Sequence, residues 1–292
     1  MSLHKRIHPN SPHYDLLIEE LKKFDSGDYG ERYIRELLEQ EFGDAFCHFA
    51  NYRLGSREID LLSVTNRACF LFEVKNIRGR VQLTHHPPQL IRTTEEGKVD
   101  VFKSPISQLE MNAMKLQQFW QENNIDLPIY AAVVFAFHNA YITTESQQLP
   151  IVIGRDVCRF IVKHIHPEGP PNVKVTQLLT QHAKRQQYLP KLAKFKLDAS
   201  NFLTGVFCPN CDYLPMKRMS YTWYCPKCQT KDRNAHIAAL QHYYELISNK
   251  ITNAECMKFL HLRNRHEAKR ILQSHCVASE GTTKGKIYTI QY

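Results

Sequence analysis

The sequence lacks an apolar run long enough to cross a membrane. A transmembrane helix needs roughly 20 consecutive, mainly apolar residues, whereas the longest apolar segment here, residues 128–137, has only the length of a strand. The N-terminal stretch MSLHKRIHPNSPHYD also lacks the apolar middle part of a secretory signal peptide. These absences exclude an integral membrane protein and predict a cytoplasmic protein with no membrane partner.

The sequence also lacks internal repeats and low-complexity tracts, and its number of cysteines is odd. Its nine cysteines argue against a disulfide framework, because the number is odd and a cytoplasmic compartment is reducing. Hydrophobic residues make up 43% and charged residues 23% of the 292 residues, as is ordinary for a soluble globular protein with about two domains.

Positive charge is concentrated in the last third of the chain. The formal net charge is +9, and residues 205–292 contain eight Lys and five Arg against two Asp and four Glu. A basic segment of this kind is typical of a protein that binds a polyanion, and nucleic acid is the expected one. A basic surface that serves only solubility would have the same composition.

The order of the expected elements predicts an α/β fold with a mixed sheet. Helical spacing of apolar residues predicts a short helix over residues 14–24 and a second helix over residues 26–42. Residues 79–104 are expected to form a polar, proline-containing excursion. The expected strands lie at residues 45–54, 58–64, 68–74, 128–137 and 150–155, and the further helices at residues 105–123 and 172–190.

An acidic constellation accompanies the central strands. Glu73 and Lys75 are two residues apart in an expected strand, so their side chains share one face of the sheet. Asp60 is on the preceding strand, and Glu31 is on the helix before it. Carboxylates with open positions suit Mg²⁺ or Mn²⁺, and a neighbouring lysine can stabilise charge on a phosphate. A solvated Glu–Lys ion pair on an exposed strand face is the alternative.

The order of these residues resembles the PD-(D/E)xK nuclease superfamily and, more narrowly, its nuclease-related domain (NERD) family. The resemblance covers about residues 26–160 and rests on GDYGE (27–31), EID (58–60), FEVKNIRG (72–79) and SPISQ (104–108). It implies a restriction-endonuclease-like αβββαβ core and metal-dependent cleavage of nucleic acid. The resemblance makes Asp60 and Glu73 metal ligands and Lys75 the catalytic lysine, with Glu31 and Gln108 as supporting residues. Glu58 stands where the family usually has glutamine.

Two CxxC pairs predict a zinc site. Cys208, Cys211, Cys225 and Cys228 have the spacing at which two tight turns complete a tetrahedral Zn²⁺ site. Four protein thiolates leave no open position, so the zinc is expected to be structural, in a zinc ribbon. Between the pairs lie two basic residues, Lys217 and Arg218, and three aromatic residues, Tyr221, Trp223 and Tyr224. This mixture suits phosphate contact and base stacking, and it equally suits a small ribbon core.

Residues 235–292 resemble a winged helix-turn-helix. Three expected helices, at residues 236–248, 252–260 and 266–273, precede a hairpin over residues 277–290, and Thr252 with Glu255 predicts a capping box. The resemblance implies DNA binding through the third helix and the wing. A small helical domain with a solvated basic face, or one that contacts protein, is the alternative. The residues expected to contact DNA here are Arg263, Arg265, Lys269, Arg270, Lys284 and Lys286.

Together these patterns predict a Mg²⁺- or Mn²⁺-dependent nuclease that acts on DNA. A non-catalytic DNA-binding or regulatory protein that retains the nuclease fold is the alternative, and the ribbon can also be read as a protein-docking module. The expected parts of the chain are an N-terminal helical lead (1–25), the nuclease-like domain (26–190), a basic linker (191–204), the zinc ribbon (205–233) and the winged-helix-like domain (234–292).

Overall fold

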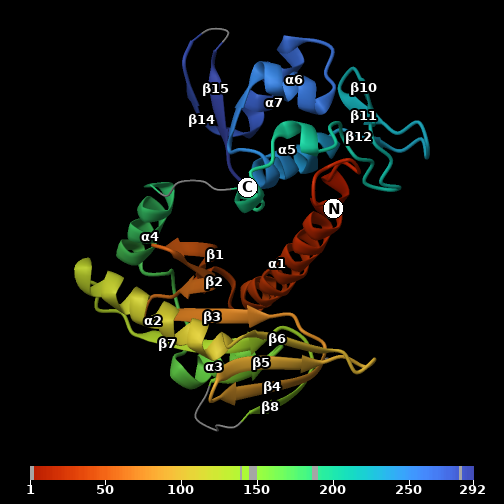
Figure 1. Ribbon diagram of the computed structural model, residues 1–292. Helices are drawn as coiled ribbons and strands as arrows, with labels where there is room; N and C mark the ends of the chain where they lie inside the picture. Colours follow the sequence, from red (N-terminus) through yellow and green to blue (C-terminus); the bar gives the residue numbers. More distant parts are fainter. Residues whose placement is uncertain (1–2, 139, 145–149, 186–189, 283–284) are drawn as a thin grey trace. The chain divides into compact units, whose positions relative to one another are not determined.

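The computed structural model describes residues 3–138, 140–144, 150–185, 190–282 and 285–292. The chain divides into two compact units (Figure 1). Residues 26–186 form one unit, which we call the central unit. The other, the terminal unit, combines the N-terminal residues 1–25 with residues 187–292. Among the described residues, no helix combines the length and the apolar character that a membrane span requires.

A five-stranded mixed sheet forms the middle of the central unit. The strand order is β1-β2-β3-β7-β9, with antiparallel pairing among the first three strands and parallel pairing from β3 to β7 and β9. This sheet and its helices confirm the predicted αβββαβ order. The strands are β1 (Cys47–Leu54), β2 (Arg57–Val64), β3 (Cys69–Lys75), β7 (Ile129–Phe135) and β9 (Ile151–Ile153).

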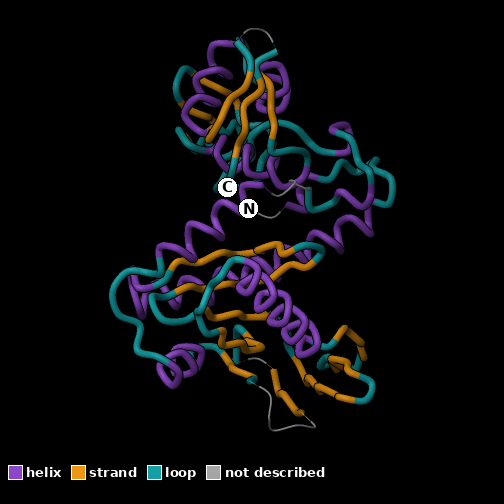
Figure 2. The backbone as a smooth tube through the Cα atoms, turned by 90° about the vertical axis from the view of Figure 1, so that its left-hand side faces the viewer, coloured by secondary structure: helices purple, strands orange, loops and turns teal. Residues whose placement is uncertain are grey.

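Helices cover both faces of this sheet, as Figure 2 shows. Alternate strand residues point to opposite faces, so Leu71 packs in the cluster that includes α2 and α4, whereas Phe70 and Phe72 pack with α1 and α3. The result is a three-layer arrangement with two apolar cores. The helices are α1 (Tyr14–Phe42), α2 (Pro105–Glu122), α3 (Asp156–His164) and α4 (Val173–Arg185), and the short 3₁₀ helix η2 (Gly43–Ala45) follows α1.

The prediction of a helix break before residue 26 was wrong, because α1 is continuous from Tyr14 to Phe42. Its residues up to 25 belong to the terminal unit and the rest to the central unit. Gly27 and Gly30 lie within this helix, and each glycine destabilises a helix by about 1 kcal/mol relative to alanine. The packing of apolar side chains on both sides of them compensates for this cost. Leu17 and Leu21 are fully buried in one core, and Ile34 and Leu38 in another.

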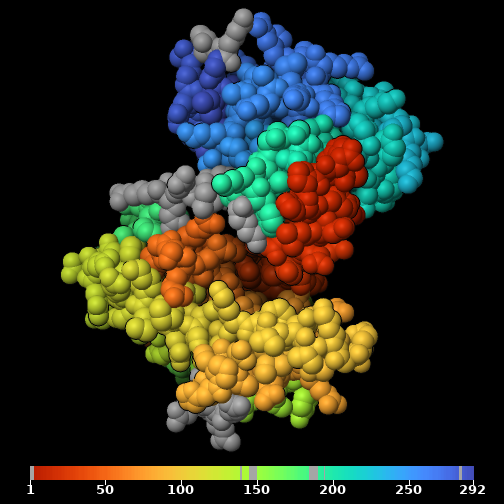
Figure 3. All heavy atoms as spheres, in the orientation of Figure 1, coloured from red at the N-terminus to blue at the C-terminus, as the bar shows by residue number. Residues whose placement is uncertain are grey.

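The segment predicted as a polar excursion, to which no strand was assigned, forms part of a second sheet. Residues 79–103 form three strands that pair with a fourth, in the order β6-β5-β4-β8. Val81 and Leu83 are buried while Arg80 and Gln82 are exposed, which is the alternation of a strand with one covered face. The strands, orange to yellow in Figure 3 except β8, are β4 (Gly79–His85), β5 (Pro88–Thr93), β6 (Val99–Lys103) and β8 (Ala140–Thr144).

In its described residues, the terminal unit contains two small sheets and the α-helices α5, α6 and α7, besides the first part of α1 and short 3₁₀ helices. The first sheet, in the order β10-β11-β12, belongs to the cysteine-rich segment, and the second, in the order β13-β15-β14, belongs to the C-terminal region. Its elements are β10 (Lys217–Met219), β11 (Thr222–Tyr224), β12 (Lys231–Asp232), α5 (Ala235–Leu246), β13 (Lys250–Thr252), α6 (Asn253–Leu260), α7 (Arg265–His275), β14 (Cys276–Glu280) and β15 (Ile287–Ile290). Helix α6 begins at the predicted capping box of Thr252 and Glu255.

One hydrophobic core joins the cysteine-rich segment to the C-terminal helices. Cys208, Trp223 and Cys225 belong to the same buried cluster as Leu240 of α5 and Ile271 of α7. These residues are at most 4% exposed. The cysteine-rich segment and the helical region therefore fold around shared apolar contacts.

The N-terminal segment and residues 191–204 pack together in the terminal unit. The buried Leu3 and Ile7 lie in one cluster with Leu192 and Phe202. Arg6 is fully buried, and its Nη1 donates to the carbonyl oxygens of Leu203 and Gly205, at 2.9 and 2.7 Å. The segment predicted as a linker thus holds buried side chains. Its short 3₁₀ helices are η3 (Ala193–Phe195) and η4 (Ala199–Asn201), and η1 (Leu3–Arg6) opens the chain.

Candidate active site and metal centre

Asp60 and Glu73 lie where the pairing of β2 and β3 ends. The ladder runs from the Val64–Cys69 pair to the Leu61–Phe72 pair, and its register, continued by one residue, places Asp60 opposite Glu73. Directly opposite residues of antiparallel strands share one face of the sheet. The backbone N–H of Val74 donates to Asp60 Oδ2 at 2.8 Å, so a side chain takes over the interaction that backbone pairing would otherwise make.

Glu73 and Lys75 form a close, mostly buried ion pair. Lys75 Nζ lies 2.6 Å from Glu73 Oε1, and the two side chains are 22% and 3% exposed. A solvated pair on an exposed strand face, the alternative left open by the sequence, does not agree with this burial. A carboxylate removed from water needs compensation, and Lys75 supplies part of it.

Carboxylates outnumber cations among the residues of this site. Burial, and after it the negative charge of Glu73, raise the pKa of Asp60 to about 7. Burial alone would lower the pKa of Lys75, but the charges of Glu73 and Asp60, with a contribution from Glu31, raise it. Lys75 is therefore a cation at neutral pH, and one cation faces more than one carboxylate. A further positive charge would be stabilised here.

Helix α1 contacts the end of β3 closely, and this contact brings Glu31 near enough for its charge to raise the pKa of Lys75. Asn76 Nδ2 donates to the carbonyl oxygen of Ser26 at 3.0 Å. A Cβ atom at Gly30 would lie 3.0 Å from the Cβ of Asn76, so a larger residue there would displace the helix or Asn76 by a few tenths of an ångström. Sequence reasoning missed Asn76 as a positioning residue, although its place directly after the Glu-x-Lys motif was a usable signal.

Two further residues of the motifs, Glu58 and Gln108, make no hydrogen bond, within the described residues, to Asp60 or Glu73, which we call the acidic pair. Glu58 is exposed and pairs with Arg53 at 3.2 Å, so it is a surface charge that contributes weakly to the raised pKa of Asp60. Gln108 is half-buried in the first turn of α2, which Ser104 caps. Among the described residues, no hydrogen bond joins Gln108 to Asp60, Glu73 or Lys75.

The acidic pair offers two carboxylate ligands. Within the described part of the chain, only the cysteine cluster brings three or more Asp, Glu, His or Cys ligand atoms within 4.8 Å of one another. Mg²⁺ commonly takes one or two carboxylates and completes its six positions with waters and substrate phosphate. Asp60 and Glu73, hard oxygen donors with an excess of negative charge, fit such an ion.

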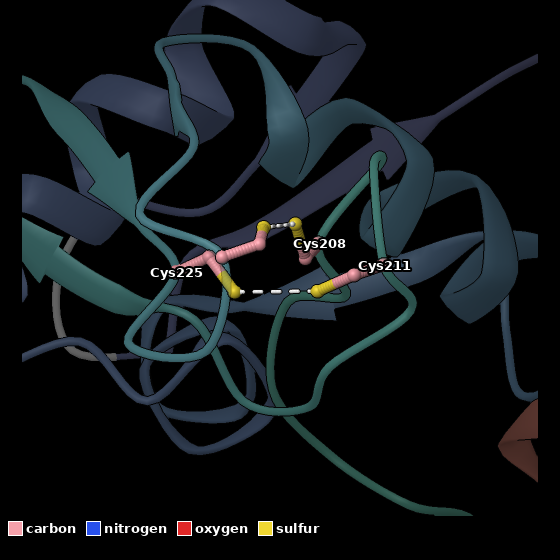
Figure 4. Close-up of side chains that lie close together, drawn as sticks. Cys208, Cys211 and Cys225 are labelled. Carbon is pink, nitrogen blue, oxygen red and sulfur yellow. Dashed lines mark hydrogen bonds between the residues drawn. The ribbon is translucent and has the colours of Figure 1, made fainter.

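The four cysteine thiols converge as a zinc site requires. The Sγ atoms of Cys208 and Cys228 are 3.5 Å apart, and those of Cys211 and Cys225 are 3.6 Å apart (Figure 4). Tetrahedral Zn²⁺ with bonds of about 2.3 Å sets its sulfur ligands about 3.8 Å apart. The geometry therefore fits one four-coordinate zinc ion.

Backbone geometry repeats at the two CxxC turns. The residue that directly follows the second cysteine of each pair has a positive φ. The value is 56° for Asp212 and 61° for Gln229. Hydrogen bonds from the side chain and the backbone of Thr230 lower the pKa of Cys228 to about 5, and the thiolate is the form that binds metal. Together with the three-stranded sheet β10-β11-β12, the two turns have the architecture of a zinc ribbon.

The structure separates the aromatic residues of the ribbon. Trp223 is fully buried and fills the shared core, whereas Tyr221 is 69% exposed. Of the basic residues predicted to contact DNA, Lys284 lies outside the described residues, and Lys286 is half-buried over the ring of Tyr288. Arg218 is half-buried. The exposed ones are Lys217, Arg263, Arg265, Lys269 and Arg270.

An αβββαβ core with an acidic pair on its central strands is the arrangement expected of a nuclease-like α/β domain. The family model of the nuclease-related domain matches residues 26–136, which confirms the family resemblance drawn from the motifs. The match includes Glu31, Asp60, Glu73, Lys75 and Gln108. No curated protein and no solved structure matches the chain.

Proposed function

We propose that this protein is a metal-dependent nuclease that hydrolyses phosphodiester bonds of DNA. The observation that carries the proposal is the meeting of Asp60, Glu73 and Lys75 on one face of β2 and β3. These residues lie within the segment that matches the nuclease-related domain. The burial of Glu73 and the raised pKa of Asp60 support a site built for a cation.

Each residue has a role that its position supports. Asp60 and Glu73 hold Mg²⁺ or Mn²⁺, which when bound polarises a phosphate oxygen and lowers the pKa of water. Lys75, a cation at neutral pH, donates from Nζ to the scissile phosphate or to the attacking water and stabilises developing negative charge. Glu31 helps to keep Lys75 protonated. Gln108 has a supporting role at the start of α2.

The terminal unit docks the enzyme on its substrate. Its helices and strands follow the order α5, β13, α6, α7, β14, β15, which is the order of a winged helix-turn-helix, with α7 as the recognition helix. The exposed cations of α7 and of the ribbon contact phosphates. The zinc is structural. Thiolate ligands and free cysteines suit the reducing environment of the cytoplasm.

The test is cleavage of single- and double-stranded DNA with and without added Mg²⁺ or Mn²⁺. Metal is omitted rather than removed with EDTA, because EDTA would also strip the zinc. We expect cleavage by the wild type and its loss in Glu73→Ala and Lys75→Ala. Glu58→Ala, which removes an exposed carboxylate from β2, the strand of Asp60, should cut normally. Equal cutting by all four proteins would exclude the proposed catalytic residues.

A non-catalytic DNA-binding protein is the second candidate. It is favoured by the finding that the described residues gather only two carboxylates at the acidic site. This candidate predicts salt-dependent DNA binding and intact DNA under every metal condition. If deletion of residues 205–292 leaves affinity and its salt dependence unchanged, the docking role of the terminal unit is excluded.

A further inference from the structure

The hairpin of β10 and β11 presents different side chains on its two faces and at its tip. Arg218 and Trp223 are directly opposite each other, and the guanidinium carbon of Arg218 lies 5.0 Å from the Trp223 ring centroid. Since Trp223 is fully buried, this face belongs to the core. Ser220 has a φ of 50° and turns the chain, so that Tyr221 stands at the tip of the hairpin.

Tyr221 is held at the tip by a residue of α7. The guanidinium carbon of Arg270 lies 5.0 Å from the centroid of the Tyr221 ring, within the range of a cation–π contact. The tyrosine is nevertheless 69% exposed, and Met219 beside it is 52% exposed. One cation thus contacts the aromatic ring while most of the ring surface remains in water.

Positive charge predominates in the two segments that carry this ring and its partner Arg270. Residues 205–233 contain five Lys and Arg against two Asp, and α7 contains three against Glu267 alone. Lys217 on the hairpin and Lys269 on α7 are exposed. A phosphate backbone beside the ring would therefore meet cations from both elements.

We propose that the hairpin tip and α7 form one surface for single-stranded nucleic acid, with a base stacked on Tyr221 and phosphates on Lys217 and Lys269. This rests on the proposed function in that nucleic acid is the substrate class, and it adds a single-strand contact at the hairpin tip to the duplex contact proposed for α7. Bases in a duplex are already stacked on one another, whereas unpaired bases stack on exposed aromatic side chains. An exposed ring that contacts Arg270, on a basic hairpin and beside a basic helix, therefore favours a single strand.

The experiment measures the binding of a fluorescein-labelled 20-nucleotide oligo-dT and of a 20-base-pair duplex by anisotropy. All proteins are full-length, zinc-loaded and carry Glu73→Ala, without added Mg²⁺, so that no cleavage interferes. We expect Tyr221→Ala to raise the Kd for oligo-dT at least about fivefold, the change that about 1 kcal/mol of base stacking gives. The Kd for the duplex should change less than about twofold, below that stacking effect.

Two further variants decide what the tyrosine contributes. Tyr221→Phe keeps the ring and should bind oligo-dT like the parent protein. Tyr141→Ala removes an equally exposed tyrosine, 70% exposed on β8 of the central unit, and should have no effect. Zinc content shows that Tyr221→Ala is folded. An unchanged oligo-dT affinity, an equal loss for duplex, or an equal loss in Tyr221→Phe would overturn the proposal.

Failure of this inference is distinguishable from failure of the nuclease proposal. Cleavage of the same oligo-dT is measured separately, with Mg²⁺ and without the Glu73→Ala change. Binding that depends on Tyr221 without any cleavage would support this surface and exclude the nuclease. Cleavage of oligo-dT, together with an oligo-dT affinity that is unchanged in Tyr221→Ala, would exclude this surface and support the nuclease proposal.

Discussion

The backbone N–H of Val74 donates to the side chain of Asp60 at the point where β2 and β3 stop pairing. The bond engages one carboxylate oxygen and holds the group beside Glu73. It also lowers the pKa of Asp60, but burial and the charge of Glu73 prevail and raise it to about 7. The fold therefore orients a carboxylate at a place where its negative charge is unfavourable without a cation.

The first prediction concerns Asp60→Asn. The amide oxygen can still accept from Val74, while the charge that repels Glu73 is lost, so we expect a folded protein whose melting temperature without metal at pH 8 equals or exceeds that of the wild type. Added Mg²⁺ should raise the melting temperature of the wild type, since a ligand at a hundred times its Kd stabilises by about 2.7 kcal/mol. It should not raise that of the variant.

The control for this prediction is Glu58→Gln, which removes a carboxylate two residues away whose partner is Arg53. Its response to Mg²⁺ should equal that of the wild type. A full Mg²⁺ shift in Asp60→Asn would show that the cation binds elsewhere.

The second prediction concerns Lys75→Met. Methionine keeps much of the apolar stem and removes the cation 2.6 Å from Glu73. We expect kcat for DNA cleavage to fall roughly 10²- to 10³-fold, as when a single stabilising donor is lost from other active sites. Because the Asp60–Glu73 pair remains, Mg²⁺ should still bind, as measured by calorimetry. Loss of Mg²⁺ binding together with activity would make the role of Lys75 structural.

The third prediction concerns zinc removal. Cys208 and Cys225 are fully buried in the core that contains Leu240 and Ile271, so loss of the metal should loosen the helices as well as the ribbon. After treatment with a zinc chelator, hydrogen exchange should accelerate in α5 and α7. The amides of β3 and β7 in the central unit serve as an internal control and should keep their protection. Protected amides in α5 and α7 would show that the core suffices without zinc.

Features set by local spacing could be predicted from the sequence. The convergence of the four cysteines follows from two CxxC turns, and the capping box of α6 follows from Thr252 and Glu255, because each involves residues close in the chain. The acidic pair required more. Asp60 and Glu73 come together only because of the register in which β2 pairs with β3, and the hairpin between the strands sets this register. In the sequence, only the order of the motifs indicated it.

Features set by distant pairing could not be predicted. Strand β4 pairs in parallel with β8, Gly79 opposite Ala140, and no local pattern links segments so far apart. The alternation of Arg80, Val81 and Gln82 was nevertheless a readable strand signal. The contact of Gly30 with Asn76 likewise depends on where α1 meets the sheet.

The last prediction concerns pH and His48 on β1. Burial, and after it the positive charge of Arg35, lower the pKa of His48 to about 4, and its Nδ1 lies 2.8 Å from Ser63 Oγ. As pH falls below about 6.5, His48 becomes protonated in the unfolded chain, whereas in the folded protein it stays neutral down to about pH 4. Stability should therefore decline from about pH 6.5 to about pH 4, by up to about 3 kcal/mol from this residue.

The test of the His48 prediction compares urea unfolding at neutral and acidic pH. His48→Gln is neutral at both, so its free energy of unfolding should fall by about 2 to 3 kcal/mol less than that of the wild type. Contributions shared by both proteins, including those of the zinc ligands, cancel in this difference. The exposed His166, changed to Gln, is the matched control and should leave the decline unchanged. Equal declines in the wild type and His48→Gln would show that the buried imidazole accepts its proton without loss of the fold.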